Sequence, residues 1–222
     1  LNRTVYASIV AYLLQRNGFP ETGQVLTANS TAALEGSTGA LTTPPPPVAA
    51  GRGGGFGGGA TPGGTNTYRA ITDFSPVTDA ELANPDPGDW LSYRRTLDGQ
   101  GYSPLDEINR DNVSGLSLAW VWSMDAGVNQ PTPLVHDGIM YLTHPMNHVQ
   151  ALDAATGELL WDYRRTFPEG YRAGFSQLRS IAIYDDKIII PTKDAWLVAL
   201  DATTGEIIWE TQVADYRQGY TN

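Results

Sequence analysis

Short apolar runs separated by turn residues dominate the second half of the chain. The runs are rich in Val, Ile, Leu and Tyr, and Gly, Asp, Asn or Pro residues bound them. This pattern is typical of short β-strands joined by tight turns. We expect two sets of four strands, at residues 132–135, 139–143, 148–152 and 158–163, and at residues 180–184, 187–191, 196–200 and 206–211.

An eleven-residue sequence occurs twice in this region. It covers residues 151–161 and again residues 199–209, 48 residues later, and the match extends upstream without a gap to residues 132 and 180. Each copy contains an Asp-Ala-x-Thr-Gly turn, in which the Asp can bond local backbone and the Gly can adopt a positive φ. A repeat of this length marks stacked supersecondary units, here blades of a β-propeller. The alternative is two unrelated hairpins with similar turns.

The number of repeats bears on how complete the propeller is. A closed propeller needs about four to eight blades, and a blade without its neighbours leaves an apolar face uncovered. The sequence shows two full repeats and begins at Leu1 rather than Met. We therefore expect the chain to be a fragment of a longer protein.

The composition divides the chain into three parts. Residues 1–26 have apolar positions at helical spacing, and Gly18 and Pro20 end the predicted helix. Residues 27–66 are a Pro/Gly-rich, low-complexity stretch that predicts a disordered linker. Residues 67–222 have a globular composition and contain all six Trp residues, which favours a mostly β fold.

Weaker signals precede the repeats. Thr78–Glu81 has the form of a capping box that begins a short helix, which Pro85 would end. We expect a strand at 90–93 and a second short helix that begins near residues 103–106. Residues 117–123 predict the closing strand of a preceding, partial blade.

Charge and composition exclude several classes of function. The chain has 24 acidic and 14 basic residues, for a formal net charge of −10, so it lacks the basic surface that nucleic acid requires. No apolar run approaches the roughly 18 residues that span a bilayer. The absence of cysteine excludes disulfides, thiolate metal ligands, Cys nucleophiles and CxxCH haem attachment within this sequence.

Several motifs resemble those of a known family. The sequences that begin Trp90-Leu-Ser-Tyr-Arg-Arg and Thr132-Pro-Leu-Val-His-Asp resemble the amino-terminal part of PQQ-dependent alcohol dehydrogenases, and the two eleven-residue copies match that family's tryptophan-docking motif. The resemblance covers roughly residues 77–222. Residues 5–20 are similar to the last helix of a class I cytochrome c domain. Together these features imply a quinohaemoprotein, with the cytochrome domain before an eight-bladed propeller.

The resemblance carries an expected chemistry. It implies that pyrroloquinoline quinone (PQQ) binds on the propeller axis with Ca²⁺, and that a small alcohol is oxidised to an aldehyde or ketone. An Asp acts as general base, and electrons pass to a c-type haem in the same chain, in the periplasm. The cofactor carries the redox chemistry.

The resemblance also implies that most of the active site lies elsewhere in the full-length protein. The catalytic Asp is expected beyond Asn222, on a later blade, together with the calcium ligands. The haem ligands are likewise expected outside this sequence. We therefore assign no catalytic residue and no metal ligand here, and we expect the isolated fragment to be inactive.

Two cofactor-binding positions carry over from the family. Gln130 stands where the family commonly has Glu, and it keeps hydrogen-bonding capacity without the charge. Arg179 matches an Arg whose guanidinium could bridge quinone oxygens and stabilise the reduced cofactor. A vicinal Cys pair found before this Arg in some relatives is absent from residues 173–178. The alternatives are that Gln130 caps the start of a strand and that Arg179 is a surface ion partner.

The three histidines raise the possibility of a metal site. His144 and His148 flank a Pro-Met-Asn turn, and no carboxylate or Cys is close to them in the sequence. We therefore expect these histidines, and His136, to face solvent in loops rather than to bind zinc. Trp120, Trp161 and Trp209 are predicted to pack between blades rather than against a cofactor.

Two other functions remain open. One is a non-enzymatic propeller scaffold of the outer-membrane assembly type, which would need neither a cytochrome domain nor an Arg at the axis. The other is a polyvinyl-alcohol dehydrogenase, which shares the combination of cytochrome and propeller. A CxxCH sequence upstream and calcium ligands in later blades would favour the enzymes over the scaffold.

Overall fold

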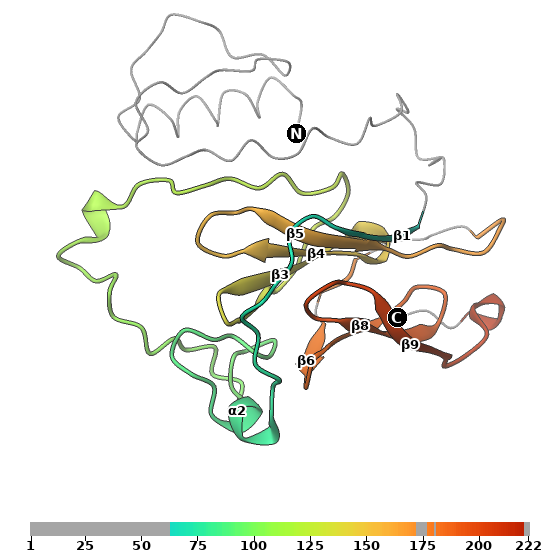
Figure 1. Ribbon diagram of the computed structural model, residues 1–222, viewed down its shortest axis with the longest axis horizontal. Coiled ribbons are helices and arrows are strands. Elements are labelled where there is room, and N and C mark those ends of the chain that lie inside the picture. Colours follow the sequence, from blue (N-terminus) through green and yellow to red (C-terminus); the bar gives the residue numbers. More distant parts are fainter. Residues whose placement is uncertain (1–62, 172–176, 180, 220–222) are drawn as a thin grey trace, which may run out of the picture. The chain divides into compact units, whose positions relative to one another are not determined.

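A computed structural model describes residues 63–171, 177–179 and 181–219 (Figure 1). The described chain falls into two compact units, of which residues 108–121 form one and the remainder forms the other. The smaller unit contains a single 3₁₀ turn, Val113–Gly115. Within the described residues, no helix is both long and apolar enough to cross a membrane.

Some of the sequence predictions fall outside these described residues. They are the cytochrome helix at 1–26, the linker up to residue 62 and the last positions of the chain, which include Asn222. The position of the catalytic Asp, expected beyond Asn222, therefore stays a prediction. The same holds for the calcium and haem ligands.

The larger unit contains two antiparallel sheets, and Figure 1 labels all of their strands except β2 and β7. The first sheet has the order β1-β5-β4-β3-β2 and the second the order β6-β7-β8-β9. Their bounds are β1 Gly64–Thr67, β2 Leu134–His136, β3 Ile139–His144, β4 His148–Asp153, β5 Leu159–Arg164, β6 Ala182–Tyr184, β7 Lys187–Pro191, β8 Trp196–Asp201 and β9 Ile207–Gln212. The eight strands predicted from the two repeats are confirmed, each to within two residues at either end.

The eleven-residue repeat folds in the same way in both sheets. Asp153 and Asp201 each accept hydrogen bonds at 2.8–3.0 Å from the backbone N–H groups two and three residues later. Gly157 and Gly205 then adopt φ values of 73° and 75°, which only glycine takes without strain. Both sheets also change register at the equivalent point, just before the Asp. The turn chemistry expected from the sequence is therefore what forms each hairpin.

Strand β1 is an addition that the sequence did not indicate. It begins at Gly64, within the last residues of the stretch predicted as linker, and pairs with β5. Asn66 donates to Asp162 at 2.9 Å, and Thr65 donates to the carbonyl of Gly205 in the second sheet at 2.9 Å. The strand lacks apolar side chains, so polar contacts that depend on the tertiary structure hold it in place.

One of the weaker sequence signals is confirmed. Helix α2, Asp79–Ala83, begins with the predicted capping box, in which the Thr78 N–H donates to Glu81 at 2.7 Å and the Glu81 N–H donates back to Thr78 at 3.3 Å. The helix ends before Pro85, as expected. The carbonyl of Pro85 then accepts a hydrogen bond from the buried guanidinium of Arg95, which fixes the turn after the helix.

The other three weak signals are wrong. Trp90 makes a single bridge to Val135 instead of starting a strand, because the chain turns back between Ser92 and Arg95. Ser103 caps the N–H of Leu105 at 3.3 Å, but no helical turn follows, since a cap alone does not repay the cost of nucleation. Residues 117–123 form no strand, because they take no ladder partner among the described residues.

The two sheets are joined by the packing of an indole on a glycine. Trp161 on β5 is fully buried and donates from Nε1 to the carbonyl of Ala202 at 2.9 Å. A Cβ atom added to Gly205 would lie 2.5 Å from the Trp161 ring. Tyr141 donates to the same Ala202 carbonyl at 3.1 Å. Trp209, which occupies the position of Trp161 in the second repeat, is 37% exposed.

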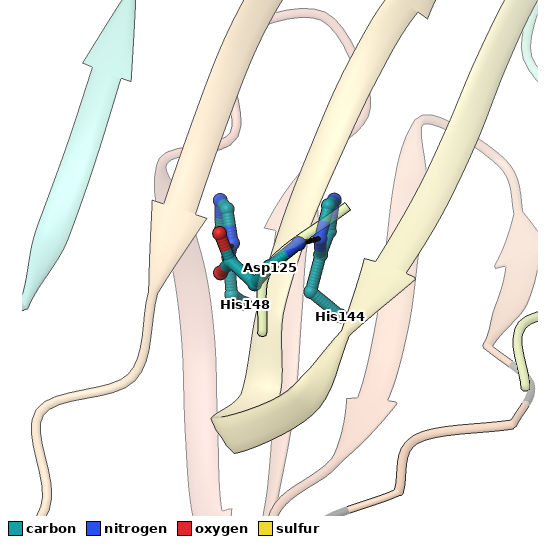
Figure 2. A group of neighbouring side chains, drawn as sticks. All are labelled: Asp125, His144 and His148. Carbon is teal, nitrogen blue, oxygen red and sulfur yellow. Dashed lines mark hydrogen bonds and ion pairs between the residues drawn. The ribbon is translucent and has the colours of Figure 1, made fainter. Parts of the chain in front are cut away.

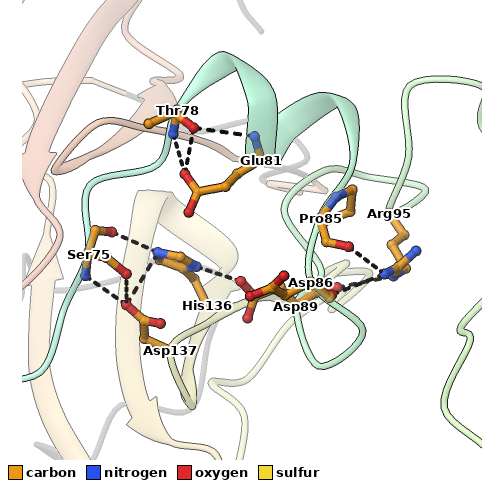
Figure 3. A network of polar contacts seen from close by, with 9 residues as sticks. All are labelled: Ser75, Thr78, Glu81, Pro85, Asp86, Asp89, Arg95, His136 and Asp137. Atoms are coloured by element: carbon orange, nitrogen blue, oxygen red, sulfur yellow. Dashed lines mark hydrogen bonds and ion pairs between the residues drawn. The ribbon is translucent and has the colours of Figure 1, made fainter.

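A buried histidine ties the leading segment to the first sheet (Figure 3). His136 contacts Asp89 through Nδ1 at 2.8 Å and the Ser75 carbonyl through Nε2 at 2.8 Å, so the prediction that it faces solvent is wrong. Both ring nitrogens face acceptors, so the imidazolium form satisfies both contacts. Burial alone would lower the pKa of His136, but the Ser75 carbonyl, Asp89 and Asp137 together raise it. Since the Ser75 hydroxyl donates to Asp137, this group is structural rather than a nucleophilic triad.

The contact between indole and glycine predicts a specific loss of stability. In Gly205→Ala, the new residue must adopt a left-handed backbone and also displace the indole. We therefore expect the free energy of unfolding to fall by about 2–4 kcal/mol. Ala at Gly138 is the matched control, because its φ is 73° and open space surrounds the added Cβ. That change should cost about 1–2 kcal/mol from backbone strain. Urea unfolding measures both, and equal losses would mean that the indole contact does not control stability.

The His136 cluster predicts a pH dependence. Its folded pKa is raised above the unfolded value of about 6.5, so its contribution to stability is complete below that pH and is lost as pH rises through the folded pKa. We expect the free energy of unfolding to fall above about pH 6.5, by at most about 1.4 kcal/mol per pH unit. His136→Gln should flatten this slope in pH-dependent urea unfolding. A slope that persists in the variant would assign it to another group.

Candidate functional site

The sequence-predicted cofactor residues lie at one end of the two sheets. The β2–β3 register pairs Leu134 with Tyr141 in antiparallel fashion, so the residues just before β2 lie level with the end of β3. Strands β6 and β7 are also antiparallel, so the residues just before β6 lie level with the end of β7. Gln130 and Arg179, which precede β2 and β6, therefore lie at the end where β3 connects to β4 and β7 to β8.

The structure brings these two residues into direct contact. Arg179 Nε donates to Gln130 Oε1 at 3.1 Å, and the Thr132 N–H donates to the Arg179 carbonyl at 2.9 Å. Both side chains are exposed. The two sheets therefore bring together one polar residue from just before each repeat, 49 positions apart in sequence.

The charge of Arg179 is available to an anionic ligand. Its other side-chain hydrogen bond goes to the neutral amide of Gln177 at 3.0 Å, and no ion pair within the described part of the chain includes it. Lys193 is close enough that burial and the charge of Arg179 together lower its pKa. In a chain of net charge −10, this is a local concentration of cations and amide groups. Such a set fits a group that carries carboxylate and quinone oxygens.

The same end of the first sheet contains a cluster of Asp125, His144 and His148 (Figure 2). The two histidines pair across β3 and β4, and their rings stack with centroids 4.5 Å apart and planes at 27°. Only 2% of His144 and 1% of His148 is exposed. The prediction that they face solvent, with no carboxylate nearby, is wrong for both residues.

Asp125 contacts both imidazoles at once. Its backbone N–H donates to His144 Nδ1 at 3.1 Å, while its Oδ2 lies 2.6 Å from His148 Nδ1. Arg164 Nη1 also donates to this Oδ2 at 3.0 Å. Because Asn129 donates to the Asp125 carbonyl at 2.7 Å, the cluster anchors the loop that leads to Gln130.

The environment sets the protonation states of the cluster. Burial alone would raise the pKa of Asp125, but hydrogen bonds and charges from His148 and Arg164 hold the pKa well below its usual range. Burial, with a smaller contribution from His148, lowers the pKa of His144 to about 4. At neutral pH the cluster therefore contains a carboxylate and a neutral imidazole, both in forms that can bind a cation.

Sequence reasoning missed this cluster for a specific reason. Asp125 lies 19 positions before His144, in a segment without periodicity, so nothing in the sequence places it at the hairpin. A signal for the histidines did exist. His144 follows the buried Leu142 by two positions along β3, and residues two apart in a strand have their side chains on the same face.

The fold of this chain has relatives among known proteins. Residues 90–211 match the family described as the glucose/ethanol/alcohol dehydrogenase β-propeller domain, PQQ. The dehydrogenase subunit of the quinone alcohol dehydrogenase from Gluconacetobacter polyoxogenes is 44% identical over 142 residues, which cover 61% of this chain and 19% of that protein. The quinone 1-butanol dehydrogenase of Thauera butanivorans is 39% identical over 158 residues, which cover 68% of the chain and 25% of that protein.

Solved structures show the same relationship. The quinohemoprotein alcohol dehydrogenase ADHIIG from Pseudomonas putida superposes with a TM-score of 0.61 at 37% identity, over 68% of this chain and 23% of that one. A europium-containing methanol dehydrogenase gives a TM-score of 0.56 at 31% identity, over 64% and 26% of the respective chains. The chain thus spans about a fifth to a quarter of the length of these relatives. Its two sheets are propeller blades, and the chain belongs to the family of PQQ-dependent alcohol dehydrogenase β-propellers.

Proposed function

We propose that this chain is part of a PQQ-dependent alcohol dehydrogenase and that Arg179 and Gln130 bind the quinone cofactor. The reaction would oxidise a small alcohol to an aldehyde or ketone. The observation that carries the proposal is the contact between Arg179 and Gln130. It presents an amide together with a guanidinium that forms no ion pair within the described residues, at the start of two neighbouring blades. A propeller scaffold without a cofactor would have no need of this arrangement.

The two side chains have distinct roles in the proposed site. Arg179 has five N–H donors in a planar fork, of which Nε points to Gln130 and one Nη2 hydrogen to Gln177, so further donors remain for cofactor oxygens. The Gln130 Nε2 group is a second donor. When bound, PQQ would accept the electrons of the alcohol, and Arg179 would stabilise the negative charge that develops on the cofactor oxygens. The neutral Gln130 leaves that positive charge uncompensated, whereas a Glu would pair with it.

Other parts of the proposal concern the whole protein. We infer that electrons pass from the quinone to a c-type haem in a cytochrome domain joined through the stretch at 27–62. Such a tether keeps a haem at high effective concentration near the quinone. A general-base Asp on a blade beyond Asn222, Ca²⁺ beside the quinone and a periplasmic location complete the proposal. Support comes from the sequence resemblance and from relatives that are named as quinohemoproteins.

Substitution of Arg179 tests the proposed cofactor site in the intact natural protein. A charge-assisted hydrogen bond contributes about 1.5–3 kcal/mol, so Arg179→Gln should weaken PQQ binding by roughly 10- to 100-fold. Gln130→Ala removes a neutral donor and should weaken it by only about 2- to 10-fold. Titration of the apoprotein with PQQ measures both changes, and PQQ-dependent dye reduction with ethanol measures the activity.

The matched control is Arg69→Gln. Arg69 is another exposed arginine, but it pairs with Asp153 and Glu158 at the opposite end of the first sheet. Its loss should leave PQQ affinity unchanged. If Arg179→Gln binds PQQ as tightly as the control does, the assignment of these residues to the cofactor fails. If the intact protein shows neither PQQ binding nor alcohol oxidation, the enzymatic function itself fails.

A further inference from the structure

The cluster of Asp125, His144 and His148 brings three potential metal-ligand atoms close together. Its three candidate ligand atoms all lie within 4.8 Å of one another. The Nε2 atoms of both histidines are buried and have no hydrogen-bond partner that meets geometric criteria. Each ring still has a second polar neighbour, because His148 Nε2 lies 3.6 Å from Asp162 Oδ2 and the Gln150 side chain contributes to the pKa of His144. The Nδ1 atoms of both rings face Asp125.

The ligand types indicate which ion would fit. Two imidazoles and one carboxylate are a donor set that Zn²⁺ and related divalent transition metals accept, and in catalytic zinc sites three such ligands leave a further position open. Ca²⁺ prefers six to eight oxygen ligands, so this cluster does not suit the calcium expected beside the quinone. The cluster is also separate from Gln130 and Arg179, since neither side chain is among its ligands.

A second carboxylate supports the orientation of His148. Its Nδ1 faces Asp125, and its Nε2 lies 3.6 Å from Asp162 Oδ2, which is largely buried. Asn66 on β1 donates to the other oxygen of Asp162 at 2.9 Å and thereby holds that carboxylate in place. Histidines that bind a metal through one nitrogen commonly direct the other N–H to a carboxylate. His148 between Asp125 and Asp162 has this arrangement.

From this geometry we propose that Asp125, His144 and His148 bind one divalent transition metal ion of the Zn²⁺ class, through the carboxylate and the two Nδ1 atoms. The ion binds His148 at Nδ1, and any hydrogen on that atom is released to solvent. The Nε2 atom of the ring stays directed at Asp162 Oδ2, 3.6 Å away. His144 Nδ1 exchanges the backbone N–H of Asp125 for the ion. Bonds of about 2.0–2.1 Å in a tetrahedron place ligands roughly 3.3 Å apart, so the stacked rings must rotate inward by about an ångström.

Arg164 opposes metal binding in this arrangement. Its guanidinium lies 3.0 Å from Asp125 Oδ2, so an ion must compete with it for the carboxylate. The side chain is 31% exposed, and its Nε already lies 3.8 Å from Asp162. Arg164 can therefore move toward Asp162 without leaving the network. This competition gives the proposal a consequence that a purely structural cluster lacks, because removal of Arg164 should strengthen metal binding.

The test is a metal titration of the intact natural protein in the presence of excess Ca²⁺, which occupies oxygen-rich sites. Zn²⁺ should bind with a stoichiometry of one, and Co²⁺ in its place should give the visible absorption of a four- or five-coordinate site. His144→Gln and His148→Gln should weaken Zn²⁺ binding by at least about 100-fold, and Asp162→Asn by about 10- to 100-fold. His136→Gln changes the one histidine of the sequence that lies outside the cluster, so it is the matched control and should not change the Zn²⁺ affinity.

Arg164→Gln adds a measurement of the competition, because it should tighten Zn²⁺ binding by about 2- to 5-fold, the effect of one partly exposed charge pair. X-ray absorption of the wild-type zinc complex should show two imidazoles, which keeps the test valid if a histidine variant fails to fold. Absence of stoichiometric Zn²⁺ binding, or an affinity that is unchanged in both histidine variants, would overturn the proposal. The cluster would then be a hydrogen-bonded anchor for the loop.

Discussion

The burial of Trp161 against Gly205 is the contact on which the rest of the arrangement depends. The indole needs a flat, side-chain-free surface, and the Asp-Ala-x-Thr-Gly turn of the next blade supplies it, with the Ala202 carbonyl as acceptor for the indole N–H. One residue type therefore satisfies two requirements at once, since Gly205 gives both the positive φ of the turn and the space for the ring. Because the motif recurs in the next repeat, the same contact can set the angle and spacing at which successive blades stack. Trp209 is the equivalent residue of the second repeat, and it is exposed because no glycine turn of a further blade covers it among the described residues.

The antiparallel order within each blade decides where function can reside. Residues that precede the first strand of each repeat lie at the same end as the connection between its second and third strands. This topology collects Gln130, Arg179 and the His144–His148 pair at one end, although they come from distant parts of the sequence. The His136 cluster lies at the other end, where Asp137 and Gly138 connect β2 to β3, and there it supports the leading segment. The two histidine clusters thus illustrate how position in a blade separates a structural role from a proposed ligand-binding one.

Electrostatics distinguish the two ends further. The chain is acidic overall, yet Arg179 has only amide partners among the contacts described for its side chain. Around Asp125 the charges are instead paired, with Arg164 beside two carboxylates and His148 between the same two. A partly buried network of this kind contributes little net stability, but it is sensitive to the removal of any one member. A cation in the network would therefore act on the loop that presents Gln130, through Asp125 and Asn129.

Much of this protein could be predicted from local sequence, and the rest could not. The strands, the repeated turns and the capping box at Thr78 follow from short-range chemistry, because periodicity and turn residues act over a few positions. Gln130 and Arg179 were assigned from the family resemblance, and the structure places them in contact. Strand β1 and the burial of His144 and His148 depend on partners far away in sequence. Residues 117–123 form no strand because no ladder partner pairs with them among the described residues. Asp125 and Asp162 lie beside His148, and Asn66 beside Asp162, through contacts between distant parts of the chain. Tertiary structure alone therefore decided which polar residues became a buried cluster, since burial changes both their protonation and their possible ligands.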